Sequence, residues 1–298
     1  MTSIELTAPA KVNLFLKVLN KRKDGYHNIL TLFERITLAD EIKISKIPKG
    51  ITVSSDKFIT RDPKDNLVYK AAKLILAYKK VKTGVRITIK KRIPIAAGLG
   101  GGSSDAASAL MGINKLLNLK LKEAELVNLG KILGADVPFF ILNTPFAVGK
   151  ARGDELKKID MKIRPWHLII YPGFKVATRT VYEAFDAPDF ALTRKVGDAK
   201  IIPSLRHTMD LDGIDSMLYN DLQDTVIAKK EAIGRIVRRL ASLLDKKAIV
   251  SGSGPSVFCL YRTRKETLEG KKKLFACVPA SERKSWLSFV AGTQGLKN

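Results

Sequence analysis

The residues best suited to chemistry lie in a glycine-rich stretch, residues 94–107, which reads Pro-Ile-Ala-Ala-Gly-Leu-Gly-Gly-Gly-Ser-Ser-Asp-Ala-Ala. Glycine has no Cβ and readily adopts positive φ, so consecutive peptide N–H groups of such a loop can turn around an anion. The stretch follows an alternating strand pattern and runs into a helix pattern, whose N-terminal dipole also favours negative charge. These flanks distinguish it from a flexible linker and predict a phosphate-binding loop. The predicted binding residues are Pro94, Gly98, Leu99, Gly100, Gly101, Gly102, Ser103 and Ser104.

This loop differs from two common nucleotide-binding patterns. No lysine follows its last glycine, as one does in a P-loop, and Ser103 stands where the dinucleotide fingerprint has its third glycine. We therefore expect backbone N–H groups and hydroxyls to hold the phosphate.

Phosphoryl transfer also needs a group that orients or deprotonates the acceptor, and a positive charge beside the transferred phosphate. Asp136 is the candidate for accepting the proton of an acceptor hydroxyl. Lys11 is the candidate for keeping Asp136 ionised and for offsetting charge at the γ-phosphate. Spacing alone leaves simpler explanations open, an exposed strand lysine for Lys11 and a turn carboxylate for Asp136.

The elements that position these residues are predicted from apolar periodicity. Alternation over residues 11–18 predicts a half-buried strand with Lys11 and Asn13 on the same face. The Asp-Gly dipeptide at 24–25 predicts a hairpin turn into a second strand at 29–38.

Helical periodicity predicts three helices in the first half, over residues 67–78, from the glycine loop to about 117, and over 122–133. Asp136 then falls between the last of these helices and an apolar strand predicted at 137–140. A carboxylate in that position is expected to be partly buried and to need a partner.

A polar, glycine-containing stretch at 149–156 predicts a boundary between two domains, residues 1–156 and 157–298. The second half shows, in order, a strand at 167–171, a long helix at 225–244, a strand at 248–250, a glycine turn at 251–255 and a strand at 256–261. Strands and helices mixed in both halves predict an α+β fold.

The composition gives weaker information about partners. The chain of 298 residues has 53 basic and 29 acidic side chains, a net charge of +24, which suits a nucleic acid, a membrane surface or a polyanionic small substrate. The basic residues are scattered without interleaved aromatics, so we expect a solvated basic surface and no stable nucleic-acid partner. Cys259, Cys277 and the three histidines show no metal-ligand spacing. Because we find no signal-like or membrane-spanning apolar stretch, we expect no membrane partner and a cytoplasmic location.

Several stretches read together resemble the GHMP kinases, the family of galactose, homoserine, mevalonate and phosphomevalonate kinases. Residues 94–107 resemble the second motif of that family, and Ser-Gly-Ser-Gly-Pro-Ser at 251–256 resembles its third. The family usually has serines directly after Gly-Leu-Gly, whereas here Gly101 and Gly102 come first. This doubled glycine resembles the loop sequence of one branch of the family, whose acceptor is a diphosphocytidyl-linked methylerythritol. The similarity to that branch extends through residues 9–14, 24–27, 66–68, 134–140 and 220–222.

The resemblance implies a two-domain GHMP kinase fold, with an N-terminal half of the ribosomal protein S5 domain 2-like type and a ferredoxin-like C-terminal half. It implies that ATP, with Mg²⁺, donates a phosphoryl group directly to the 2-hydroxyl of the diphosphocytidyl methylerythritol, in the non-mevalonate route to isoprenoid precursors. Lys11 and Asp136 match the catalytic pair of the family, and Asn66 matches a residue near the adenosine of ATP. No spacing singles out a magnesium ligand, and we expect a monomer or a homodimer.

The acceptor side is also implied by the resemblance. His27 matches the residue that reads the cytosine edge, and a neutral imidazole supplies one donor and one acceptor. Tyr26 and Tyr182 match aromatic positions on the two faces of the base, and stacking there excludes water. Asn13 and Thr178 match polar contacts to the substrate.

Two alternatives stay open at this point. A sister kinase acting on mevalonate or homoserine would share the glycine loop but would have no use for a histidine flanked by an aromatic residue. An RNA-binding module is a different class of protein, suggested by the basic charge and by the occurrence of the N-terminal fold in ribosomal proteins. Salt-sensitive RNA binding that competes with ATP hydrolysis would favour the module.

Overall fold

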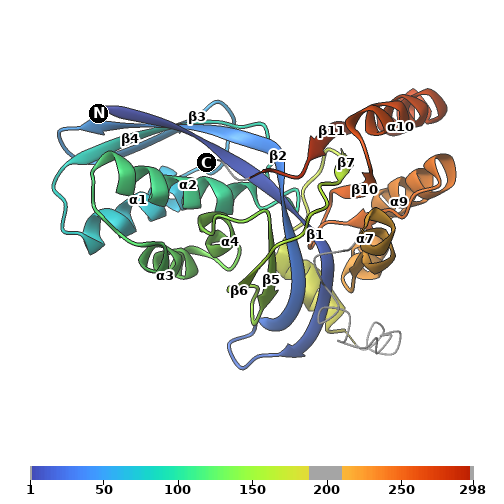
Figure 1. Ribbon diagram of the computed structural model, residues 1–298, viewed down its shortest axis with the longest axis horizontal. Coiled ribbons are helices and arrows are strands. Elements are labelled where there is room, and N and C mark those ends of the chain that lie inside the picture. Colours follow the sequence, from blue (N-terminus) through green and yellow to red (C-terminus); the bar gives the residue numbers. More distant parts are fainter. Residues whose placement is uncertain (1, 188–209, 296–298) are drawn as a thin grey trace.

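The computed structural model describes residues 2–187 and 210–295, which form two β-sheets with helices packed against them (Figure 1). The strands of the larger sheet are β1 (Ser3–Lys21), β2 (His27–Ile47), β3 (Ile51–Ser55), β4 (Gly84–Lys90), β5 (Phe146–Lys150), β6 (Glu155–Ile159) and β8 (Tyr219–Asn220). Their order is β3-β4-β2-β1-β8, and β5 pairs with both β2 and β6. The strands of the smaller sheet, in the order β11-β7-β10-β9, are β7 (Trp166–Tyr171), β9 (Ile249–Val250), β10 (Val257–Tyr261) and β11 (Leu287–Gly292).

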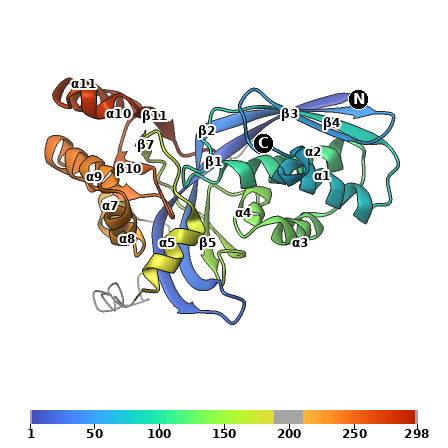
Figure 2. The same ribbon diagram turned by 180° about the vertical axis from the view of Figure 1, so that it is seen from behind.

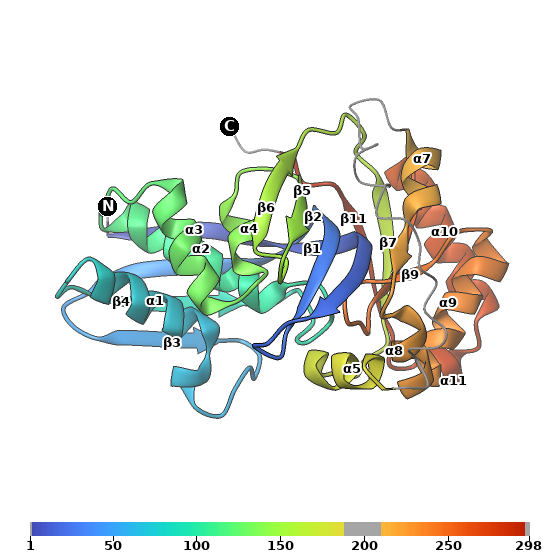
Figure 3. The same cartoon turned by 90° about the horizontal axis from the view of Figure 1, so that it is seen from below.

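The helices form two groups, one on either side of the β1–β2 ribbon in Figure 3. Those at the end of β3 and β4 are α1 (Leu67–Tyr78), α2 (Gly101–Leu116), α3 (Glu123–Leu133) and α4 (Val137–Ile141), with a short 3-10 turn, Pro63–Asp65, before α1. Those around the smaller sheet are α5 (Thr178–Phe185), α7 (Leu211–Met217), α8 (Gln223–Lys229), α9 (Glu231–Leu244), α10 (Arg264–Cys277) and α11 (Ala280–Arg283). One apolar cluster lies between the larger sheet and α1 to α4, a second between the two sheets, and a third between the smaller sheet and its helices. The predicted α+β fold is confirmed.

The long antiparallel pair of β1 and β2 joins these regions. Its register runs from Ser3 opposite Ser45 to Lys21 opposite His27, so the ribbon passes from the first group of helices to a hairpin that ends beside α5 (Figures 1 and 2). Near the middle, β8 adds to β1 in parallel at Phe15. The ribbon therefore carries residues from one end of the molecule to the other.

The strand predicted at 11–18 is confirmed within β1, but the prediction of a half-buried strand is wrong. Residues 8–16 are all buried. Val12 and Leu14 pack in the cluster between the sheets, while Lys11 and Asn13 are covered from the other side. The polar side chains on one face predicted that this face is exposed to solvent, whereas Lys11 and Asn13 are buried in the structure.

Two further predictions are wrong in detail. The apolar segment after Asp136 is the helix α4 and not a strand, because Asp136 takes the N-cap position and a proline follows within the first turn. The helix predicted at 225–244 is divided into α8 and α9 at Lys230, whose φ of −144° and ψ of 84° are not helical. The predicted domain boundary at residue 156 lies within β6, a strand of the larger sheet, and the chain enters the smaller sheet at β7. The division into two domains stays a prediction.

Candidate active site

The glycine loop is shaped by close backbone approaches. Gly98 and Gly100 have φ of 77° and 69°, in the left-handed region that favours glycine. A Cβ at Gly98 would lie 2.3 Å from the carbonyl oxygen of Ser251, so no larger residue fits there. Helix α2 begins at Gly101 with Gly100 as its N-cap, which puts Ser103 in its first turn and not at the cap. The N-terminus of a helix of four turns thus faces the loop, as anion binding requires.

The second glycine turn, at 251–256, holds the first one in place. Ser251 donates from Oγ to the carbonyl of Gly98 at 3.0 Å, and the N–H of Ser256 donates to the carbonyl of Ala97 at 3.2 Å. Asn220 in turn donates to the carbonyl of Gly252 at 2.7 Å. The second glycine turn and Asn220 of β8 therefore fix the conformation of the predicted phosphate-binding loop.

Lys11 and Asp136 are brought together across the start of α4. Lys11 Nζ lies 3.4 Å from Asp136 Oδ2, and the side chains are 6% and 33% exposed. Lys11 also donates to Asn13 Oδ1 at 2.6 Å, which confirms that these two residues share a face. Asn13 is held by a hydrogen bond of 2.8 Å to Thr31 Oγ1. Asn13 thus holds the Lys11 side chain in place, while the Asp136 carboxylate is partly exposed to solvent.

One cavity of about 1020 Å³ connects the glycine loop to the β1–β2 hairpin. The predicted site residues that line it are Lys11, Asn13, Tyr26, His27, Asn66, Pro94, Gly98, Gly100, Gly101, Gly102, Ser103, Asp136, Thr178 and Tyr182. Leu99 and Ser104 do not line it, because both are buried behind the loop. Leu99 packs there in the apolar cluster between the two sheets, and its carbonyl accepts the N–H of Lys11 at 2.9 Å.

Asn66 and Thr178 also have structural partners. The side chain of Asn66 accepts the N–H of Val68 at 2.9 Å and so caps α1. Thr178 Oγ1 lies 2.8 Å from Ser253 Oγ, which links α5 to the second glycine turn.

At the far end of the cavity, His27 lies against Tyr182. The ring centroids are 5.0 Å apart with an interplanar angle of 22°. His27 Nε2 is 2.8 Å from Asp186 Oδ1, and Lys21 donates to Asp186 Oδ2 at 2.7 Å. Burial works to raise the pKa of Asp186, but the hydrogen bonds from Lys21 and His27 outweigh it and hold that pKa below its usual value. The pKa of Tyr182 is raised, first by burial and then by the negative charges of Asp136 and Asp221.

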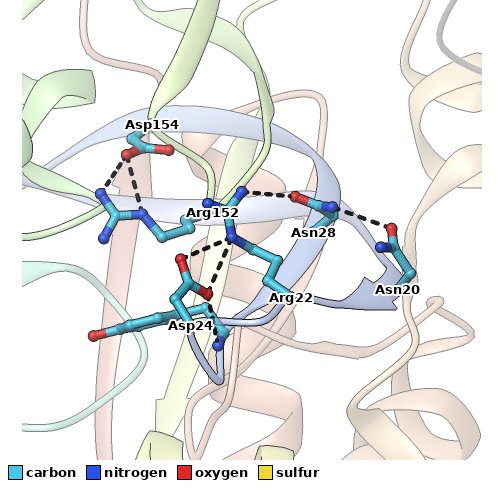
Figure 4. Close-up of polar contacts among 7 residues, drawn as sticks. Asn20, Arg22, Asp24, Asn28, Arg152 and Asp154 are labelled. Atoms are coloured by element: carbon cyan, nitrogen blue, oxygen red, sulfur yellow. Dashed lines mark hydrogen bonds and ion pairs between the residues drawn. The ribbon is translucent and has the colours of Figure 1, made fainter.

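Polar contacts hold the hairpin that carries Tyr26 and His27 (Figure 4). Arg22 Nε donates to both carboxylate oxygens of Asp24, at 3.0 and 3.2 Å, and Arg22 Nη1 donates to Asn28 Oδ1 at 3.1 Å. Asp24 also accepts the N–H of Tyr26 at 3.2 Å. The turn is therefore fixed by side chains at both of its ends.

Arg152, which sequence reasoning missed, reaches the same hairpin from the loop after β5. Arg152 Nη2 donates to Asp154 Oδ2 at 2.6 Å (Figure 4), and its guanidinium carbon lies 5.4 Å from the ring centroid of Tyr26. Tyr26 is 58% exposed, so this cation–π contact covers one face of an otherwise open ring. The polar, glycine-containing segment 149–156 predicts a domain boundary, and nothing in it indicates a contact with Tyr26.

A buried charged cluster beneath the glycine loop was also missed. Lys91 Nζ donates to Asp105 Oδ2 at 2.7 Å and to Asp40, and all three side chains are almost fully buried. Burial lowers the pKa of Lys91, but the two carboxylates outweigh it and raise that pKa. Burial raises the pKa of Asp105 to about 7, against the opposing effect of Lys91 and with the support of Asp40. The sequence signals for this cluster are the basic run at 90–92 before the loop and Asp105 after its two serines.

Asp105 predicts a pH-dependent stability. Because native Asp105 keeps its proton up to about pH 7 and the unfolded chain releases it near pH 4, the native state binds more protons in that window. The free energy of unfolding of the wild type should therefore fall as pH rises from about 4 to about 7. Asp105→Asn cannot ionise at this position, so its stability should lack this fall. We expect the Tm of wild type relative to Asp105→Asn to drop by several degrees between about pH 4 and pH 8. A constant difference, measured with the exposed-site variant Asp212→Asn as control, would contradict this.

Within residues 2–187 and 210–295, no group of three or more His, Cys, Asp or Glu side chains is arranged to hold a metal ion. No helix in those ranges is long and apolar enough to cross a bilayer.

A glycine loop at a helix N-terminus, a second glycine turn against it and a lysine–aspartate pair beside it define a phosphotransferase for small molecules. The family model for the GHMP kinases N terminal domain matches residues 66–144. A protein of Syntrophus aciditrophicus called 4-diphosphocytidyl-2-C-methyl-D-erythritol kinase is 37% identical over 271 residues, 91% of this chain and 94% of the relative. The kinase of the same name from Geobacter sulfurreducens is 40% identical over 262 residues, 88% of this chain and 91% of the relative.

A solved structure agrees with these relatives. It is described as 4-(cytidine 5'-diphospho)-2C-methyl-D-erythritol kinase, is 30% identical, covers 98% of this chain and 100% of its own, and superposes with a TM-score of 0.77. The chain therefore belongs to the 4-diphosphocytidyl-2-C-methyl-D-erythritol kinase family of the GHMP kinases. The predicted resemblance and kinase fold are confirmed, with ATP as the phosphate donor of this class. Membership also favours an enzyme over the RNA-binding module that the basic charge left open.

Proposed function

We propose that this chain transfers the γ-phosphoryl group of ATP to the 2-hydroxyl of 4-diphosphocytidyl-2-C-methyl-D-erythritol, a step of the non-mevalonate route to isoprenoid precursors. One observation carries the proposal. A single cavity has the glycine loop and the Lys11–Asp136 pair at one end, and the aromatic residues Tyr26, His27 and Tyr182 at the other. A long acceptor with a nucleotide at one end and a hydroxyl at the other suits such a cavity.

In the proposed reaction, Asp136 accepts the proton of the 2-hydroxyl as its oxygen attacks the γ-phosphorus. The bond from that phosphorus to the β–γ bridging oxygen breaks, and ADP leaves with the electron pair. Lys11, with Nζ 3.4 Å from Asp136 Oδ2, pairs with the carboxylate and offsets the negative charge that develops on the transferred group. Asn13 keeps Lys11 in place through its hydrogen bond.

ATP would be held by the N–H groups of the glycine loop and of the first turn of α2, with Asn66 near the adenosine. Asp136 in this cavity is paired with Lys11, and Asp105 is held by Lys91 and keeps its proton up to about pH 7. A Mg²⁺ that arrives with ATP would therefore take most of its ligands from phosphate oxygens and water, as Mg²⁺ commonly does, with Ser103 at the same end of the cavity. Bound there, it offsets triphosphate charge.

The cytosine end has a specific hydrogen-bonding argument. Asp186 is held ionised and can only accept, so His27 must carry a proton on Nε2, 2.8 Å away. In the neutral ring this leaves Nδ1 as an acceptor. Cytosine presents an amino group where uracil presents a carbonyl oxygen, so His27 selects cytosine. Tyr182 and Tyr26 add ring surface for stacking.

A calorimetric titration with CDP and UDP tests this pocket. We expect UDP to bind about tenfold more weakly than CDP, since it lacks the amino donor and sets a carbonyl oxygen against Nδ1. Equal affinities for the two nucleotides would contradict the proposed role of His27.

The aromatic residues predict a second outcome, measured by steady-state kinetics. His27→Ala and Tyr182→Ala should each raise the KM for the diphosphocytidyl alcohol by about 10- to 100-fold, because each removes a contact of about 1–3 kcal/mol to the base, while kcat changes less. Tyr78→Ala, at an exposed tyrosine outside the cavity, is the matched control. An unchanged KM in both cavity variants would remove the cytosine pocket from the account.

The same proposal covers the setting of the enzyme. Its donor and its acceptor are small and soluble, so we place it in the cytoplasm, as a monomer or homodimer with no membrane or stable nucleic-acid partner.

A further inference from the structure

We propose that Arg35 is a positioning residue for phosphoryl transfer. It fixes the C-terminal end of α4 and thereby holds Asp136, at the N-terminal end of the same helix, against Lys11. The inference rests on the proposed function in one respect, the role of Asp136 as the group that accepts the proton.

The contacts of Arg35 converge on the end of α4. Its Nη2 atom donates to the carbonyl oxygens of Phe139, Phe140 and Leu142, at 2.9, 3.3 and 2.6 Å. Its guanidinium carbon lies 5.5 Å from the ring centroid of Phe139. Leu142 is the C-cap of α4, so these carbonyls belong to the last turn, where a helix has no N–H groups of its own to offer.

Helix α4 needs such a partner because it is short. It spans five residues, and helices of this length are unstable without tertiary contacts. The cation of Arg35 sits at the helix C-terminus, where the backbone dipole favours positive charge. Burial lowers the pKa of Arg35 to about 10, so the side chain is still a cation at neutral pH.

The strand pair places Arg35 and Lys11 as neighbours. The two residues are directly opposite in the register of β1 and β2, so their side chains leave the sheet on the same face. Lys11 reaches the N-terminal end of α4 at Asp136, and Arg35 reaches its C-terminal end. Between them, the Phe33 ring stacks on Phe139 at 5.0 Å and lies 5.2 Å below Lys11 Nζ.

Both ends of α4 are therefore held by side chains of one ribbon. Like charges directly opposite in a sheet are normally unfavourable, and here each cation has its own end of the helix as partner. A shift of α4 along its axis would change the distance between Asp136 and Lys11. Misplacement of a catalytic group by about 1 Å is enough to cost about 100-fold in rate.

The test compares Arg35→Met, which keeps length without a donor, with Arg35→Lys, which keeps one cation. We expect Arg35→Met to lower kcat by about 100-fold with the KM for ATP and for the alcohol within about threefold, and Arg35→Lys to recover about tenfold of that loss. Arg86→Met, at an exposed arginine of β4 in the same sheet, is the matched control and should behave as wild type. Thermal unfolding and ADP titration report whether each variant is folded.

The outcomes separate this inference from the proposed function. Folded Arg35→Met and Arg35→Lys with kcat near wild type would overturn it, as would a loss of rate that matches the loss of folded protein. If Arg35→Met does not fold, a tenfold lower kcat at unchanged KM in folded Arg35→Lys supports the inference, and a wild-type kcat overturns it. Wild-type turnover by Asp136→Asn would instead overturn the proposed function itself.

Discussion

Asp136→Asn is expected to lower kcat by about 1,000-fold or more, because the amide retains the shape of the side chain but cannot accept the proton of the acceptor hydroxyl. ADP affinity should stay within about threefold, since the nucleotide is held mainly by the glycine loop and the start of α2. The effect should therefore appear in kcat and not in the KM for ATP. This split distinguishes loss of a chemical group from loss of the binding site.

The measurement is steady-state ADP release with both substrates, together with a calorimetric ADP titration. Asp212→Asn is the matched control, because Asp212 is exposed and pairs with Arg262 far along the chain. A kcat for Asp136→Asn within tenfold of wild type would remove Asp136 from the mechanism.

Lys11→Met is expected to lower kcat by about 100- to 1,000-fold, since it removes the buried positive charge that offsets the transferred phosphoryl group. The methionine fills a similar volume, so packing over Phe33 should be retained. The KM for ATP should also rise, because the charge at the γ-phosphate is lost in the bound state as well.

Lys17→Met is the control for that variant, with the same substitution in the same strand but outside the cavity. Thermal unfolding of both variants shows whether the change is confined to the site. If Lys11→Met and Lys17→Met have the same kcat, Lys11 has no part in the transfer.

Much of the donor side could be predicted from sequence, because local rules determine it. The period of two in a strand puts Lys11 and Asn13 on one face, and the structure joins them by a hydrogen bond. The glycines of the loop predicted positive φ, and Gly98 and Gly100 adopt it. Asn66, a favoured helix-capping residue type directly before the apolar period of residues 67–78, caps α1. In each case the cause lies within a few residues of the effect.

Other features depend on what packs from far along the chain. The strand around Lys11 reads as half-buried because its alternation does not show that α4 and the second glycine turn cover the polar face. The segment after Asp136 has the apolar run of a strand, and the end of its helix is held by Arg35, 107 residues before Leu142 in the chain. That contact is not visible as periodicity.

The acceptor side shows the same limit. Tyr26, His27 and Tyr182 were predicted only through the resemblance to known kinases, and their roles stay a prediction. His27 meets Tyr182 and Asp186 across more than 150 residues of chain, so no local spacing indicates the contact. Arg152 was missed for the same reason, because it meets Tyr26 from a distant part of the chain.

The central claim is most directly tested by the acceptor dependence of ADP release. The purified chain is assayed with ATP and Mg²⁺ alone, and then with 4-diphosphocytidyl-2-C-methyl-D-erythritol, mevalonate or homoserine. The account predicts that only the diphosphocytidyl alcohol drives stoichiometric ADP release, with the new phosphate on its 2-hydroxyl. Release driven by mevalonate or homoserine, or no response to the diphosphocytidyl alcohol, would contradict it.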